Sequence, residues 1–155
     1  MNQDWLEFLA ELQAAGVRYL VVGAHALAVH GVPRATVDLG VWVDPTPDNA
    51  DRVMRALAEF GAPAAALGVS RDDFSRPDTV AQFGLPPRRI DVTTSVSGIA
   101  AFDDAWSQRV VERVGPVEGV AFIGRDALVA NKLASARTKD LADVETLNSP
   151  GVGGA

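Results

Sequence analysis

The chain has 155 residues, of which 48% are hydrophobic and 22% are charged, and its formal net charge is −6. This length and composition are typical of one globular domain with a substantial core. The absence of cysteine excludes disulfides, thiolate metal sites and a cysteine nucleophile, and the acidic balance argues against general affinity for nucleic-acid backbones.

The first quarter of the chain alternates helices and strands. Apolar residues at helical spacing predict a helix over 4–15, and short apolar runs rich in β-branched residues predict strands over 17–22 and 37–43. Between these strands, Gly23 ends the first and the alanine-rich segment 24–30 is expected to be helical. The acidic start of the chain is not typical of a signal peptide and no apolar run approaches 18 residues, so a cytoplasmic protein without a membrane span is the expectation.

The next segment is expected to begin a helix at Thr46, as its N-cap, and to end it at Gly61. Residues 61–78 have little pattern and are expected to form a loop with a helical turn near 71–74. The remaining elements are predicted in chain order as strands 79–85 and 88–94, helix 102–108, a hairpin of strands 110–114 and 117–123, and helices 126–137 and 139–147.

This order of elements predicts an α/β (α+β) fold in which a mixed β-sheet is flanked by helices and followed by C-terminal helices. We expect a single domain over 1–148 and a flexible glycine-rich tail over 149–155. Residues 61–78 are the segment expected to line a substrate pocket, should the chain have one, with Arg71 and Arg76 as contacts.

Two aspartates lie in predicted strands. Asp38 begins one strand and Asp91 interrupts the apolar alternation of another, and two such carboxylates on neighbouring strands could hold magnesium between them. Each also has a structural interpretation. Asp38 could be a capping or turn residue, and Asp91 could lie on the solvent face of an edge strand, paired with Arg88 or Arg89.

Two further segments could contact phosphate. Backbone N–H groups exposed where the strand ends at Gly23 and Ala24 suit an anion. In the last two helices, Lys132 could reach a triphosphate, with support from Arg137, Lys139, Asp140 and Asp143. The alternative is that Thr138 caps the last helix, Asp140 favours its positive end and the basic residues form a solvated face. The two histidines lack a third ligand for zinc, so His30 is expected to be a packing or turn residue.

Together these segments resemble minimal bacterial nucleotidyltransferases of the AbiEii-like group, which belong to the polymerase-beta-like superfamily and are associated with toxin–antitoxin systems. The resemblance rests on five segments: Gly23-Ala24-His25-Ala26, His30-Gly31-x-Pro33-Arg34-Ala35-Thr36-x-Asp38-Leu39, the Pro-x-x-Asn49 helix start, Pro86-Pro87-x-Arg89-Ile90-Asp91, and Asn131-Lys132 followed by Lys139-Asp140-Leu141-Ala142-Asp143.

The resemblance implies a nucleotidyltransferase fold and transfer of a nucleotidyl group from an NTP to a hydroxyl of a protein, RNA or small-molecule acceptor. It implies Mg²⁺ or Mn²⁺ as cofactor, with Asp38 and Asp91 as metal and catalytic carboxylates. It also implies that Gly23 and Ala24 lie under the phosphates, and that Lys132 and Arg34 contact the nucleotide. A cognate toxin or antitoxin is the protein partner it suggests, and the small size of the chain is compatible with a homodimer.

The chain departs from the pattern at Gly40, which stands where the group has its second metal aspartate. Asp44 cannot replace that carboxylate, since it lies roughly 13 Å farther along the strand at about 3.3 Å per residue. Three hypotheses therefore stay open: a working nucleotidyltransferase, a catalytically degenerate member that acts as a nucleotide- or protein-binding module, and a plain α/β domain whose aspartates are solvated and which has no affinity for NTPs.

Overall fold

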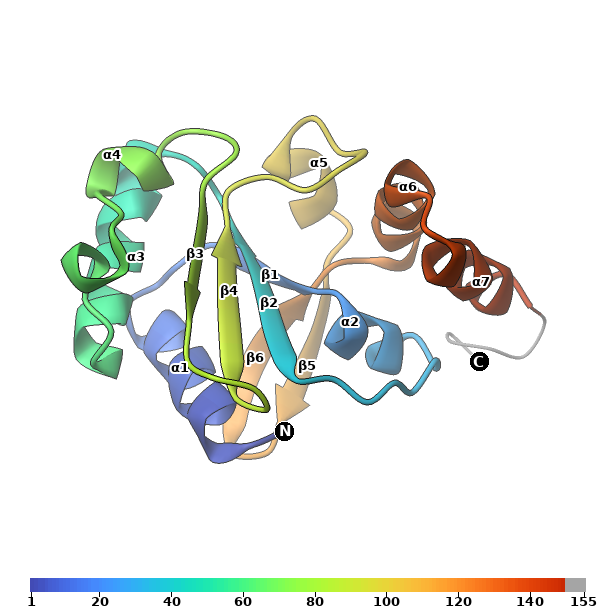
Figure 1. Cartoon of the computed structure of the whole chain (residues 1–155), viewed down its shortest axis with the longest axis horizontal. Helices are drawn as coiled ribbons and strands as arrows, with labels where there is room; N and C mark the ends of the chain where they lie inside the picture. The colour runs from blue at the N-terminus through green and yellow to red at the C-terminus, as the bar shows by residue number, and fades with distance from the viewer. Residues whose placement is uncertain (150–155) are drawn as a thin grey trace.

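The computed structural model describes residues 1–149, so the tail expected at 149–155 lies, apart from Ser149, outside the described residues. This part of the chain contains seven α-helices, one 3₁₀ helix and six strands (Figure 1). The helices are α1 (Gln3–Ala14), α2 (Ala24–Val29), α3 (Pro47–Phe60), η1 (Ala64–Leu67), α4 (Arg71–Phe74), α5 (Phe102–Trp106), α6 (Arg125–Ser135) and α7 (Thr138–Leu147). The strands are β1 (Tyr19–Val22), β2 (Asp38–Val43), β3 (Val80–Phe83), β4 (Arg89–Thr93), β5 (Val110–Val114) and β6 (Val117–Phe122).

The six strands form one mixed sheet in the order β3-β4-β2-β1-β6-β5. β2 pairs with β4 and β1 with β6 in parallel, whereas the β1–β2, β3–β4 and β5–β6 pairs are antiparallel. The mixed sheet flanked by helices is the predicted α/β class, and the predicted hairpin between β5 and β6 is confirmed.

Two apolar layers hold the sheet, because side chains alternate between the faces of each strand. On one face, α1 and α3 cover the inward side chains of the central strands. Their core includes Phe8, Leu12, Val41, Val53, Leu57, Ile90 and Val92, each no more than 1% exposed. On the other face, α2, α5, α6 and α7 pack on a second core around Trp42, whose ring meets Phe102 edge-on at 5.0 Å. Figure 1 shows these two groups of helices on opposite sides of the sheet.

Local sequence signals set most boundaries. The Thr46 side chain accepts a hydrogen bond from Asn49 N, Pro47 occupies the first turn of α3, and Gly61 ends the helix in the left-handed conformation with φ 96°. These features confirm the expected start and end of α3. Most of the other predicted elements occur within two or three residues of the expected positions.

The segment 61–78 differs from its prediction. It contains the unpredicted 3₁₀ turn η1 as well as α4, and Phe74 is buried in the core beneath α1 and α3. Arg71 pairs with Asp51 of α3 on that side of the sheet. The apolar Phe74 anchors the segment there, away from the face that carries the predicted aspartates.

Within the described range, no helix combines the length and the apolar character that crossing a bilayer requires.

Candidate functional site

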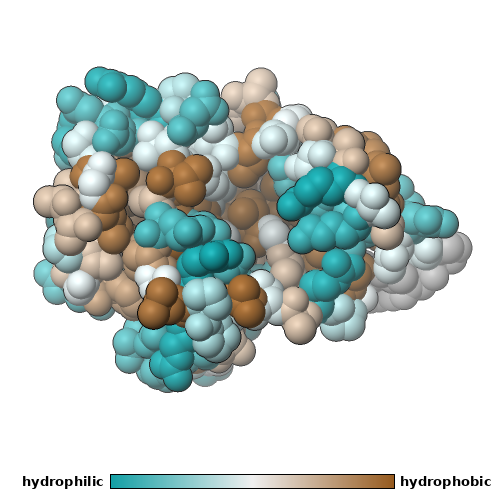
Figure 2. All heavy atoms as spheres, in the orientation of Figure 1, coloured by the Kyte–Doolittle hydropathy of each residue, from teal (hydrophilic) through white to brown (hydrophobic). Residues whose placement is uncertain are grey.

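A pocket of about 320 Å³ opens where β1 and β2 meet α2, the 31–37 loop and the α6–α7 pair. Figure 2 shows the surface hollowed between the strands and the two C-terminal helices, with hydrophilic side chains along the helical rim. The pocket is lined by Val22, Gly23, Ala24, Leu27, Arg34, Ala35, Thr36, Asp38, Gly40, Asp91, Lys132, Arg137, Lys139 and Asp143. Nearly all of the residues predicted to form a site therefore share one pocket.

The carboxylates of the pocket come from two neighbouring parallel strands. Asp38 lies opposite Arg89 and Gly40 lies opposite Asp91 in the β2–β4 register. Since alternate residues share a face, these four positions all lie on the pocket side of the sheet. The two aspartates that the sequence predicted to act together are thus brought together by strand pairing.

Both oxygens of Asp38 are held by one guanidinium. Arg89 donates from Nε to Oδ1 at 2.7 Å and from Nη2 to Oδ2 at 2.9 Å. The alternative that Asp91 lies on an edge strand and pairs with Arg88 or Arg89 is wrong. Strand β4 lies between β3 and β2, and Asp91 accepts a hydrogen bond from Gln82 Nε2 at 2.8 Å. The Asp38 pair raises the pKa of Arg89 above its ordinary value, mainly through the side-chain hydrogen bond.

This donor set does not fit a two-ion magnesium site. Magnesium prefers near-octahedral oxygen coordination, and a two-metal centre needs ions about 3.5–4 Å apart that share ligands. Here Asp38 is occupied by a guanidinium, Asp91 is engaged on one oxygen, and Gly40 supplies none. Across residues 1–149 no group of three or more acidic or imidazole side chains is placed to hold a metal ion.

The turn between β1 and α2 requires glycine at position 23, because its backbone conformation is one that residues with a side chain rarely adopt. Gly23 has φ 72° and ψ −146°, a conformation that side chains strongly disfavour, and its carbonyl accepts the N–H groups of Ala26 and Leu27 to begin α2. Gly40 is different, because its φ lies outside the left-handed region. A Cβ there would meet Val22 Cγ2 at 3.2 Å and Val22 O at 3.7 Å, so a side chain at 40 requires only a small shift of Val22.

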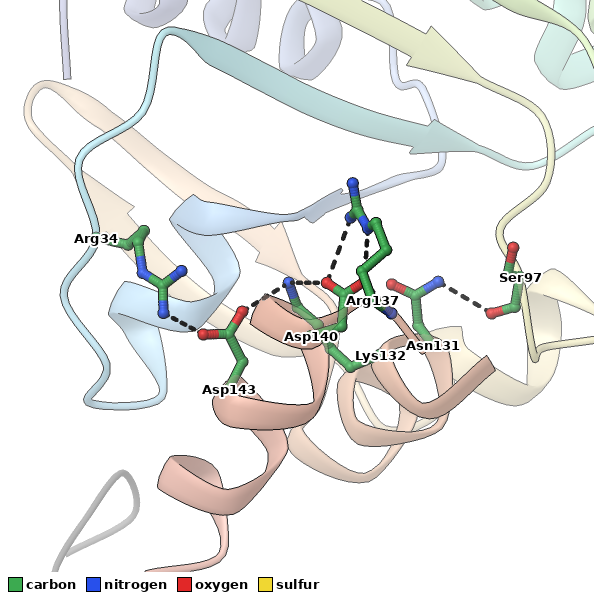
Figure 3. Close-up of polar contacts among 7 residues, drawn as sticks. All are labelled: Arg34, Ser97, Asn131, Lys132, Arg137, Asp140 and Asp143. Carbon is green, nitrogen blue, oxygen red and sulfur yellow. Dashed lines mark hydrogen bonds and ion pairs between the residues drawn. The ribbon is translucent and has the colours of Figure 1, made fainter. Parts of the chain in front are cut away.

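The basic wall of the pocket is a buried ion-pair network between α6, α7 and the 31–37 loop (Figure 3). Lys132 Nζ lies 3.3 Å from Asp140 Oδ1 and 3.1 Å from Asp143 Oδ2, and all three side chains are less than 10% exposed. Arg137 donates from Nε to Asp140 Oδ2 at 2.6 Å, and Arg34 pairs with Asp143. The hydrogen bond from Arg137, more than that from Lys132, holds the pKa of Asp140 below its usual range.

This network corrects the alternative interpretation of the C-terminal helices. Lys132 is buried rather than part of a solvated face, although Arg137 and Lys139 are exposed. The N-cap of α7 is Arg137 rather than Thr138, and the Asp140 side chain accepts from the Arg137 backbone N–H. Asp140 does lie in the first turn of α7, as expected, where a carboxylate is favoured.

Two local features fix the position of the network. The chain turns between α6 and α7 at Ala136, which adopts φ 52° and ψ 22°, a left-handed conformation that is costly for a residue with a Cβ. At the other side of α6, Asn131 Nδ2 donates to Ser97 O at 2.9 Å (Figure 3). Gly98 permits this approach, because a Cβ there would lie 2.6 Å from Ala130 O.

The local charge of the site opposes that of the whole chain. Among the described residues, four cations line the pocket (Arg34, Lys132, Arg137 and Lys139), and a fifth, Arg89, lies beside it, paired with Asp38. They meet four carboxylates of the pocket and the network behind it (Asp38, Asp91, Asp140 and Asp143). The chain as a whole carries −6. The exposed ends of Arg137 and Lys139 at the pocket rim can therefore attract a polyanion locally.

Several residues highlighted by the sequence lie elsewhere. Asn49 is buried and acts as a structural bridge, since its side chain bonds the backbone of Arg18 at 2.8 and 3.0 Å and Asp44 O at 2.9 Å. Asp44 is also buried and pairs with Arg18 beyond the far end of β2. His30 is a packing residue, as expected, with Nε2 bonded to Ile123 O at 2.9 Å. No residue of 61–78 lines the pocket, so Arg71 and Arg76 are not contacts of this site.

Two pocket features escaped the sequence reasoning. Arg89 was considered only as a partner for Asp91, and its pairing with Asp38 depends on the parallel β2–β4 register. Thr36 also lines the pocket, where its Oγ1 bonds the backbone of Asp38. The alternation of Arg89 with Ile90 and Asp91 was the available signal, because it places both charged residues on one face.

No protein-family model matches this chain, and no curated protein is significantly similar to it.

Proposed function

We propose that the chain has the nucleotidyltransferase fold and binds the phosphates of a nucleotide in the pocket between β2, α2 and α7, as a catalytically degenerate member of that group. The observation that carries the proposal is the composition of this one pocket. It places the Gly23 turn, the carboxylates of two parallel strands and a cationic rim around the same space. In the AbiEii-like group that the sequence resembles, these parts serve a nucleotide.

The chemistry of the carboxylates favours binding over turnover. In-line nucleotidyl transfer depends on charge neutralisation and orientation of the reacting oxygens, which metal ions normally supply. Asp38 is bound by Arg89 and Gly40 has no side-chain oxygen, so the side chains of the wild type are poorly suited to hold the metal ions. A binding module, with a toxin or antitoxin as its protein partner, uses the pocket without needing the missing carboxylate.

A working nucleotidyltransferase is the second candidate, because Asp38 and Asp91 both line the pocket. In that case an acceptor hydroxyl on a protein, an RNA or a small molecule attacks the α-phosphorus of an NTP, and pyrophosphate leaves. Asp91 retains one carboxylate oxygen without a protein hydrogen bond among the described residues, and so is the better placed of the two to face the reacting groups.

The test is calorimetric titration of each NTP in the presence of magnesium, with pyrophosphate release followed in parallel. The variant Gly40→Asp restores the third carboxylate, and Gly40→Ala is its matched control because it adds the same Cβ without the charge. Both should fold, since Val22 Cγ2 at 3.2 Å is the nearest neighbour of the added atom.

The expected result is that the wild type and Gly40→Ala bind an NTP without releasing pyrophosphate, and that Gly40→Asp releases it only when Arg89→Gln also frees Asp38. Release by the unmodified chain would instead establish the second candidate. If none of these forms binds any NTP, either with magnesium or in chelator, the proposed function is wrong and the pocket has another ligand.

A further inference from the structure

Asp38, which the resemblance to nucleotidyltransferases makes a metal carboxylate, is paired with Arg89 in this structure. Asp38 and Arg89 are register partners on β2 and β4, and their side chains are joined by two hydrogen bonds of 2.7 and 2.9 Å. Each side chain is about one-third exposed. The pair therefore lies at the pocket margin, where a ligand can approach it, rather than deep in the core.

The planar guanidinium satisfies Asp38 more completely than a single point charge would. Bidentate arginine–carboxylate pairs are among the stronger hydrogen-bonded ion pairs, and both carboxylate oxygens are used. A divalent ion must either displace this guanidinium or bind with the remaining oxygen of Asp91. Magnesium gives up its own water reluctantly, so one or two poorly arranged oxygens offer it little.

The opposite wall of the pocket carries its own cations. Arg137 and Lys139 are exposed there, and Arg34 lies 39% exposed beside Asp143. A free polyphosphate is more negative than its magnesium complex and gains more from these fixed charges. Five cations against four carboxylates leave the site one net positive charge, so its side chains supply part of the positive charge that a metal ion would otherwise bring.

We propose that Arg89 takes the place of a divalent cation on Asp38, so that the pocket binds the metal-free polyphosphate of its ligand. This inference rests on the proposed nucleotide-binding function and specifies the form in which the nucleotide is recognised. It also assigns Arg89 as a positioning residue, which holds Asp38 and excludes metal from it without touching the ligand itself.

The first experiment needs no nucleotide and so tests the role of Arg89 separately. Binding of Mn²⁺ to the protein alone is followed by electron paramagnetic resonance for the wild type, Arg89→Gln and the control Arg88→Gln. Arg88 is the neighbouring surface arginine, and its Nη1 pairs with Asp4 at 3.4 Å rather than with Asp38. Wild type and Arg88→Gln should bind the ion weakly, and Arg89→Gln about tenfold or more tightly, because Asp38 is released.

The second experiment titrates ATP and inorganic triphosphate calorimetrically, in chelator and in excess magnesium at equal ionic strength. The wild type should bind both in chelator at least as tightly as in magnesium. Arg89→Gln should lose about tenfold in chelator and recover with magnesium. Arg89→Lys, which keeps the charge but not the bidentate geometry, should fall between the two and serves if the glutamine variant does not fold.

The outcomes separate the two ideas. Wild-type Mn²⁺ affinity equal to that of Arg89→Gln, or wild-type binding that requires magnesium, overturns the role of Arg89 while nucleotide binding stands. Absence of ATP and triphosphate binding in both buffers refutes the proposed function, and with it the claim that the pocket takes a metal-free polyphosphate.

Discussion

Lys132→Met should destabilise the fold strongly, because it removes the central cation of a buried network. Lys132 is 8% exposed and its ammonium group lies 3.1–3.3 Å from two carboxylates that are 0% and 1% exposed. Breaking one partner from a buried pair typically costs ~3–5 kcal/mol, since a charge is left uncompensated. Arg137 still bonds Asp140 and Arg34 still pairs with Asp143. We therefore expect the lower end of that range, about 3 kcal/mol, which at this chain length lowers Tm by about 6–12 °C.

The assay is equilibrium unfolding in urea, followed by circular dichroism and tryptophan fluorescence, with the free energy compared at constant m-value. Lys139→Met is the matched control, because Lys139 is exposed at the rim of the same pocket and should change the unfolding free energy by less than about 0.5 kcal/mol. The deficit of Lys132→Met should shrink in acid, because Arg137 and Lys132 hold the pKa of Asp140 below its usual range and the stabilisation from Lys132 is lost as Asp140 takes up a proton.

If Lys132→Met lowered the unfolding free energy by less than about 1 kcal/mol, this reasoning would be refuted, because an ordinary surface ion pair contributes that much. A deficit that does not depend on pH would point to lost packing of the lysine stem rather than to stranded carboxylates.

Two further predictions concern single positions. Burial lowers the pKa of His25 below 6.5, and its Nε2 has no hydrogen-bond partner in the described structure. The unfolded state therefore binds a proton on His25 more readily than the folded state does. The unfolding free energy should fall as the pH drops through about 6.5, with a slope of at most about 1.4 kcal/mol per pH unit. This slope should be absent from the variant His25→Gln. Ala136→Gly should raise the unfolding free energy by about 0.5–1 kcal/mol, because glycine relieves the left-handed backbone at φ 52°. Ala142→Gly, in the exposed middle of α7, should lower the unfolding free energy by a similar amount. If both glycine variants lowered it, the strain argument would be contradicted.

The boundaries of α3 illustrate what local sequence could establish. Thr46, Pro47 and Gly61 act through their own backbone preferences and one neighbouring N–H, so nearby residues suffice to place the helix. The apolar periodicity of α1 and the alternation in β2 and β4 depend on the same short-range geometry. The same alternation predicted that Asp38 and Asp91 each point away from the apolar, core-facing side of their strands.

The prediction for 61–78 shows where such reasoning failed. Its side chains have no regular period, and the position of the segment was decided by Phe74, which is buried beneath α1 and α3. The residues next to Phe74 in the sequence do not indicate which face of the sheet it packs against. The sequence therefore could not show that Arg71 pairs with Asp51 of α3, nor that neither Arg71 nor Arg76 lines the pocket of the aspartates.

The sequence by itself determined which segments are helices and strands, the mixed α/β class, and the absence of a side chain at Gly40, since each depends on residue identity and short-range geometry. Only the tertiary structure decided the partners of the charged residues. Arg89 meets Asp38 rather than Asp91 because β2 and β4 are parallel in a particular register, and Lys132 is buried because α7 folds back on α6 at Ala136. Ion pairing and burial depend on residues distant in the chain. For that reason the sequence could not show that Asp38, predicted to bind metal, is paired with arginine, or that Lys132, predicted to contact the nucleotide, is the centre of a buried network.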